Sequence, residues 1–252
     1  MSDNTRSRLA SLAVRLVIAG VVVSVLAMLI GRLGIVDGRL GFFGAAGGLL
    51  IVAVGVVLGL IGIIRGLMGK PGTGLAALAA ILGVAVLAFP ISNALTNGSA
   101  PPIHDITTDL ENPPEFVSAV ALRGDDSNPL DRANPANLAD LQREAYPQLQ
   151  TLVVADDIAT VFAAALDVAN AQGWDVADAD EPENGEPGRI EATDTTLLFG
   201  FKDDIVIRIA DDGPERTLVD MRSVSRIGIS DLGKNAARID AYMQALQAKL
   251  GS

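Results

Sequence analysis

The sequence predicts three transmembrane α-helices followed by a soluble α+β domain, a two-layer sandwich of an antiparallel meander sheet with helices on one face. Two observations lead to this prediction. Residues 1–100 hold three long apolar stretches and carry seven basic and two acidic side chains, a formal charge of about +5. Residues 101–252 carry a formal charge of about −16, which brings the net charge of the whole chain to −11. Their sequence alternates between helical and strand periodicity.

The apolar stretches are predicted to span a membrane at about residues 14–30, 41–64 and 74–95, since a span takes about 20 mostly apolar residues. A signal peptide is the alternative for the first stretch, but no A-x-A-like cleavage site follows it. No acidic, Lys or His side chain lies in the middle of a span. The helices are therefore predicted to act as an anchor and not as an ion pathway.

Basic residues beside the spans predict the orientation of the chain, because cytoplasmic flanks carry the excess of Lys and Arg. With the N-terminus inside, five basic residues face the cytoplasm and two face outward: Arg6, Arg8, Arg15, Arg65 and Lys70 against Arg32 and Arg39. We therefore expect a multi-pass protein of the bacterial inner membrane with a cytoplasmic N-terminus and a periplasmic C-terminal domain.

Glycines recur along one face of the second span and are predicted to be helix-packing positions: Gly44, Gly48, Gly55, Gly59, Gly62 and Gly66. Small residues let helix backbones approach closely within lipid. This face is interpreted as packing against the other helices of the same chain, and a seam between copies in a homo-oligomer is the alternative.

The chain is predicted to divide into a membrane domain (1–96), a linker rich in Pro, Gly, Asn and Asp (97–115) and a soluble domain (116–252). Helices are expected near 137–145, from Asp156 or Asp157 to about 173, and at 231–250, the last capped by Ser230 or Asp231. Strands are expected at 151–154, 174–177, 189–195, 204–210 and 217–225.

Alternation along the strands predicts the two faces of the sheet. The side chains expected to face the helices are Ile190, Ile205, Ile207, Ile209, Val219 and Met221. The opposite face would carry Glu191, Thr193, Asp204, Arg208, Asp220 and Arg222. It is interpreted either as a solvated face with cross-strand ion pairs or as a polar groove for an anionic or zwitterionic group, with Arg208, Arg222 and Arg226 as donors.

Composition excludes several kinds of chemistry. Cysteine is absent and His104 is the single histidine, so no metal site, disulfide or cofactor is predicted. The negative charge argues against nucleic acid as a partner. Serine hydrolysis at Ser223 or Ser225 would need a base, and His104 is far away in the sequence. Neighbouring carboxylates such as Asp203 and Asp204 could perform acid–base catalysis, but carboxylates are too abundant here for a specific signal.

Three segments resemble a known family. RIEATDTTLLFGFKDDIVIRI (residues 189–209) and VDMRSVSRIGISDLGKNAARI (219–239) are similar to the signature blocks of domain of unknown function 1499 (DUF1499), and IHDITTDLENPPEF (103–116) resembles its N-terminal motif. The resemblance implies no activity, but it indicates that the charged strings have a role. The residues concerned are Glu191, Asp194, Lys202, Asp203, Asp204, Arg208, Asp220, Arg222, Ser223, Ser225, Arg226, Asp231, Asn235 and Arg238.

The leading functional hypothesis is a membrane-anchored envelope protein whose domain binds a lipid headgroup, another envelope component or a partner protein through the charged sheet face. The predicted ligand-binding residues are Glu191, Asp194, Asp204, Arg208, Asp220, Arg222 and Arg226. The alternative is an enzyme that uses carboxylate and arginine residues on the same face, with no catalytic residue assigned.

Overall fold

The computed structural model describes residues 7–213 and 215–251, so Arg6, which the orientation argument uses, lies outside the described residues. The chain divides into two compact units, Met1–Gly98 with Leu197–Gly200, and Ser99–Thr196 with Phe201–Ser252.

The first unit contains the three predicted apolar helices, α1 (Arg8–Arg32), α2 (Gly38–Leu67) and α3 (Thr73–Asn97). Each is long and apolar enough to cross a membrane. The Asp37 carboxylate caps α2 by accepting a hydrogen bond from the Arg39 backbone N–H at 2.8 Å. This satisfies one of the N–H groups that a helix start leaves without an intrahelical partner.

The glycine face of α2 is covered by the other two helices of the same chain. A Cβ atom placed on Gly55 would lie 2.7 Å from Val17 Cγ2 of α1, and one on Gly59 would lie 2.8 Å from the Ala76 carbonyl oxygen of α3. The other glycines of the set lie similarly, Gly44 and Gly48 against α1 and Gly62 and Gly66 against α3. Side chains larger than hydrogen would therefore force these helices apart.

Replacing Gly55 by leucine is expected to destabilise the helical unit by about 1–3 kcal/mol, the usual cost of overpacking. Gly47→Leu is the matched control, because an added Cβ at Gly47 meets nothing within 4 Å. Heating the full-length protein in detergent and following helix content measures the difference. Equal melting temperatures for the two variants would contradict the close packing at Gly55.

The second unit is built around one antiparallel six-stranded sheet. Its elements are β1 (Asp105–Thr107), η1 (Ala119–Leu122), α4 (Leu138–Ala145), β2 (Leu152–Val154), α5 (Ile158–Ala171), β3 (Asp175–Asp180), β4 (Gly188–Thr195), β5 (Lys202–Asp211), β6 (Thr217–Ser225) and α6 (Lys234–Leu250). The strand order is β1-β6-β5-β4-β3, and β2 pairs with the opposite end of the same β6 edge. The predicted antiparallel α+β architecture is confirmed.

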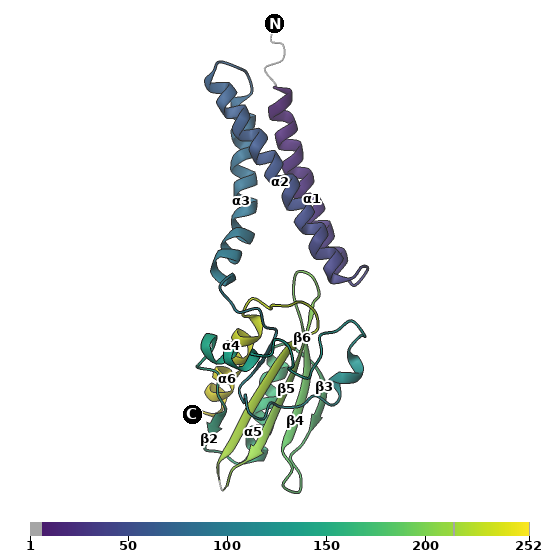
Figure 1. Cartoon of the computed structure of the whole chain (residues 1–252), viewed down its shortest axis with the longest axis vertical. Helices are drawn as coiled ribbons and strands as arrows, with labels where there is room; N and C mark the ends of the chain where they lie inside the picture. The colour runs from purple at the N-terminus through teal and green to yellow at the C-terminus, as the bar shows by residue number, and fades with distance from the viewer. Residues whose placement is uncertain (1–6, 214, 252) are drawn as a thin grey trace. The chain divides into compact units, whose positions relative to one another are not determined.

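Helices α5 and α6 pack on one face of the sheet (Figure 1). All six strand residues expected to face the helices are buried in this core: Ile190, Ile205, Ile207, Ile209, Val219 and Met221. Trp174 stacks on Tyr242 of α6 with ring centroids 5.3 Å apart. The Tyr242 hydroxyl donates to the Ala165 carbonyl of α5 at 2.8 Å, so the two helices are also joined by a buried hydrogen bond.

Two elements differ from the sequence-based expectations. Strand β1 lies inside the stretch predicted to be a linker, because a three-residue strand next to prolines gives no periodic signal. Helix α6 begins at Lys234 with Gly233 as its N-cap, so neither Ser230 nor Asp231 is the cap. The Asp231 carboxylate instead accepts hydrogen bonds from the N–H groups of Gly233 at 2.9 Å and Asn235 at 2.7 Å.

A long irregular segment, residues 108–132, covers the other face of the sheet and includes η1 (Figure 1). It is called the covering segment here. Phe116, Ala119 and partly buried Leu130 of this segment pack against Val206 and Val224 of the sheet. The charged sheet face is therefore covered by an element without regular structure and is not the solvated face that was one of its two interpretations.

Candidate functional site

Glu191 of β4 binds the backbone of the covering segment. Its carboxylate is fully buried and accepts hydrogen bonds from the N–H groups of Val117 at 2.8 Å, Ser118 at 3.1 Å and Ala119 at 2.7 Å. Arg189 lies 3.0 Å away through its Nε atom and supplies a counter-charge. Buried backbone N–H groups need acceptors, and an irregular segment cannot find them in its own secondary structure.

Arg222 of β6 does the converse and donates to carbonyl groups of the covering segment. Its guanidinium reaches the Pro114 carbonyl at 3.2 Å and the Leu130 carbonyl at 2.6 Å. The same group forms a bidentate pair with Asp105 of β1, at 3.1 and 2.7 Å. Asp105 also accepts from Arg132, so one buried carboxylate is shared by two arginines.

A second carboxylate shared by two arginines lies at the next strand. Asp204 of β5 is buried and pairs with Arg226, at 2.7 Å, and with Arg123 of the covering segment. Arg226 also donates to the Leu122 carbonyl at 2.8 Å. Arg123 donates to the Asn128 carbonyl, so the two guanidinium groups fix both ends of this part of the segment.

Arg208 and Asp220 form the third cluster. Arg208 Nη2 lies 2.8 Å from Asp220 and 2.9 Å from Asp109, and Nη1 donates to the Asn112 carbonyl at 3.0 Å. Asp220 is buried and also accepts from the hydroxyl groups of Thr108 at 2.9 Å and Thr151 at 2.6 Å. The start of the covering segment is thereby tied to the sheet.

Asp194 and Asp203 belong to the helix side of the sheet. Both accept from Arg238 of α6, at 2.6 Å each. The Ser223 hydroxyl donates to Asn235 at 2.8 Å and is buried. Arg238 thus ties α6 to the sheet through Asp194 and Asp203, whereas Arg226 binds Asp204.

These contacts do not bring the predicted site residues into one cavity. Glu191 and Arg222 are buried and bound to the covering segment, while Arg208 lines a separate cavity of about 420 Å³ among acidic side chains. Asp203 and Asp204 point to opposite faces, as neighbours in a strand must, so they cannot act as a carboxylate pair. His104 lies near the Ile229 carbonyl, and Ser223 is engaged with Asn235.

Burial shifts the pKa of several groups in this unit. It lowers the pKa values of the Arg123 and Arg132 guanidinium groups, against the opposing effect of Asp204 and Asp105. It raises the pKa of the Asp231 carboxyl above its usual value, although the Asn235 and Gly233 N–H groups act in the other direction. Within the described residues there is no group of three or more His, Cys, Asp or Glu side chains that could hold a metal ion.

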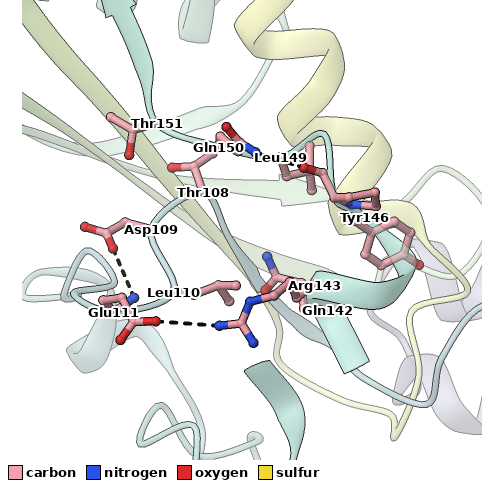
Figure 2. A pocket seen from close by; sticks show the side chains of 11 residues that line it. Thr108, Asp109, Leu110, Glu111, Gln142, Arg143, Tyr146, Leu149, Gln150 and Thr151 are labelled. Carbon is pink, nitrogen blue, oxygen red and sulfur yellow. Dashed lines mark hydrogen bonds and ion pairs between the residues drawn. The ribbon is translucent and has the colours of Figure 1, made fainter. Parts of the chain in front are cut away.

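A polar cavity of about 400 Å³ opens beside the third cluster (Figure 2). Thr108, Asp109 and Thr151 line it on the sheet side, and Gln142 and Arg143 of α4 line it on the other. Most of these polar groups already have protein partners: Thr151 binds Asp220, Asp109 binds Arg208, and the Gln142 amide donates to the Thr107 carbonyl. Of its lining residues, Tyr146 has a buried hydroxyl group without a hydrogen-bond partner among the described residues, so the cavity offers few unsatisfied groups to a ligand.

A larger cavity of about 590 Å³ lies where residues 102–105, 128–141 and 228–229 meet. It is called the apolar-walled cavity here, after the apolar side chains among its lining residues: Pro102, Pro129, Pro135, Leu138, Leu141 and Ile229. Arg132 lines it with φ 55°, a left-handed backbone conformation that is unusual for this residue type. Its Nη2 atom is buried and has no hydrogen-bond partner among the described residues.

Sequence reasoning missed Asp105, Arg123 and Arg132, which complete the shared-carboxylate clusters. All three lie in stretches without helix or strand periodicity, and the first was assigned to the linker. The DUF1499-like motif at residues 103–116 includes Asp105 and is the one sequence signal that could have identified it.

Replacing Glu191 by glutamine is expected to destabilise the second unit by about 3 kcal/mol. The amide keeps one acceptor oxygen and places a donor against the Val117–Ala119 N–H groups, leaving buried donors unpaired and Arg189 without its counter-charge. Urea unfolding of the full-length protein, followed by the fluorescence of Trp174, the single tryptophan, measures the effect. Exposed Glu181→Gln is the control, and equal midpoints for the two variants would show that Glu191 does not hold the segment.

Comparison with known proteins identifies the family of this chain. Among solved structures, CalU16 from Micromonospora echinospora matches with 13% identity over 40% of this chain and 86% of that chain, but with a TM-score of 0.21, which is too low to support a conclusion. No curated protein matches. The model of the family described as "Protein of unknown function (DUF1499)" matches residues 105–246, more than half of the chain. The chain therefore belongs to the DUF1499 family.

Proposed function

We propose that this DUF1499 protein is a membrane-anchored binding protein whose domain holds a small ligand in the apolar-walled cavity. Helices α1 to α3 would anchor it in the inner membrane of a bacterium, with the domain on the periplasmic side, as the five-to-two distribution of basic flanking residues favours. The proposal moves the binding site from the charged sheet face to the cavity next to it.

The observation that carries the proposal is the cavity itself. Ligand sites in proteins are usually concave, about 300–1,000 Å³ in volume and mostly apolar, with a few convergent polar groups. The apolar-walled cavity has a volume of about 590 Å³ and a lining surface that is mostly apolar, and its polar lining residues are His104, Asp105, Asn128, Asp131, Arg132, Asn134 and Asn137. Arg132 also has one buried donor, its Nη2 atom, that has no hydrogen-bond partner among the described residues.

The enzyme alternative has less support. The carboxylates and arginines that such an enzyme would use belong to the three clusters. Each of them is bound to an oppositely charged side chain or to backbone groups of the covering segment. Asp105, Asp204 and Asp220 are each held in an ion pair with an arginine of the domain.

Filling the cavity mouth is expected to abolish ligand retention. Asn137 lines the cavity, is exposed and makes no capping hydrogen bond through its side chain, so Asn137→Trp adds bulk without removing a known interaction. Native mass spectrometry of the full-length protein, released gently from its own membrane, should show a bound species that falls at least about tenfold in this variant, a loss of about 1.4 kcal/mol. The control is Gln172→Trp at the exposed end of α5.

The bound species should persist in Gln172→Trp, and circular dichroism should show both variants folded. Bare protein in the unmodified chain, or equal retention in all three samples, would contradict the proposed function.

A further inference from the structure

Two loops that connect elements of the sheet domain carry exposed apolar side chains. Leu197 (81% exposed) and Leu198 (43%) lie in the turn that joins β4 to β5. Ile229 (81%) and Leu232 (50%) lie in the loop that leads from β6 to α6. Scattered apolar residues are normal on a protein surface, but a group of exposed leucine and isoleucine side chains usually marks a place of contact.

The register of the sheet places both loops at the same end. Thr195 pairs with Lys202 next to the β4–β5 turn, and Asp203 pairs with Ser225 at the end of β6. Leu122 of η1 is also exposed and adjoins this end, because its carbonyl accepts from Arg226, directly after β6. The term apolar end is used below for Leu122, Leu197, Leu198, Ile229 and Leu232.

The chain enters the domain at this end. Asp105, the first residue of β1, pairs with Val224 near the end of β6. Residues 98–104 connect α3 to β1 and can span at most about 25 Å when fully extended. The covalent connection therefore limits how far the start of β1 can lie from the membrane span that α3 is proposed to form. Val153 is also exposed, but it lies on β2, which pairs with the beginning of β6 at the opposite end.

Leu232 is held in a conformation that a bulky side chain seldom adopts. Its φ is 55°, in the left-handed region that favours glycine or asparagine. The Ser230 hydroxyl oxygen accepts from the Leu232 N–H at 3.2 Å and helps to fix this turn. A strained backbone that displays leucine to solvent is consistent with a contact role for the side chain.

We propose that the apolar end inserts into the interfacial region of the lipid bilayer. The short connection to α3 favours a lipid surface as the binding partner of the apolar end. A bilayer accepts aliphatic side chains without needing a complementary binding pocket. Nearby charges are of both signs: exposed Lys202 and Lys234 follow the two loops, while Asp125 and Asp126 lie in the adjoining covering segment. Apolar burial therefore drives the contact, and anionic lipid is not required.

The test uses the full-length protein, which has no cysteine of its own. Single substitutions Leu197→Cys, Ile229→Cys and Val153→Cys each carry a nitroxide label in phosphatidylcholine vesicles. Electron paramagnetic resonance then measures collision of each label with oxygen, which concentrates among acyl chains, and with a water-soluble nickel chelate. Labels at 197 and 229 should collide more with oxygen than with nickel, and the label at 153 should show the reverse. Adding phosphatidylglycerol should leave these results unchanged.

Three results would overturn the proposal. Nickel accessibility at 197 or 229 equal to that at 153 would place the loops in water. Protection from both reagents would mean that protein covers the loops. Insertion that appears only with phosphatidylglycerol would mean that charge, and not apolar burial, drives the contact. Ile229 also lines the apolar-walled cavity but Leu197 does not, so the result at position 197 is independent of the ligand site, whose own test is ligand retention.

Discussion

The second unit depends on charged side chains of the sheet that satisfy the backbone of an irregular segment packed over them. The Glu191 carboxylate accepts hydrogen bonds from three consecutive backbone N–H groups of this segment. Arg208, Arg222 and Arg226 donate hydrogen bonds to its carbonyl groups. An apolar sheet face could not do this, and each buried polar group left unpaired costs about 1–3 kcal/mol. The charges on this face are therefore required by the element that covers it.

The same requirement explains why the arginines are paired in an unusual way. Asp105 and Asp204 are each shared by two guanidinium groups, so each cluster keeps one positive charge in excess of its carboxylate. Guanidinium groups of both clusters, those of Arg222 and Arg226, also donate to backbone carbonyl oxygens, which carry partial negative charge. Buried ion pairs add little stability relative to apolar packing, but losing one partner is costly, so such clusters fix a single arrangement of the segment.

The architecture of the chain could be predicted from periodicity, but the role of its charges could not. Ile205, Ile207 and Ile209 alternate with polar neighbours and pack on the helices as expected. The same alternation placed Asp204 and Arg222 on the other face correctly, yet it could not show that the face is buried. The covering segment has no repeating pattern, and Asp105, Arg123 and Arg132 lie far in sequence from the residues that they meet. The family resemblance marked the charged strings as important without distinguishing a structural role from binding.

Amide hydrogen exchange of the full-length protein tests this account most directly. The account predicts that the amides of residues 117–119, although outside any strand, exchange as slowly as those of β5, because their N–H groups donate to the buried Glu191 carboxylate. Exchange as fast as in the exposed turn at residues 181–185 would contradict the account. It would mean that the charged face of the sheet is exposed to solvent.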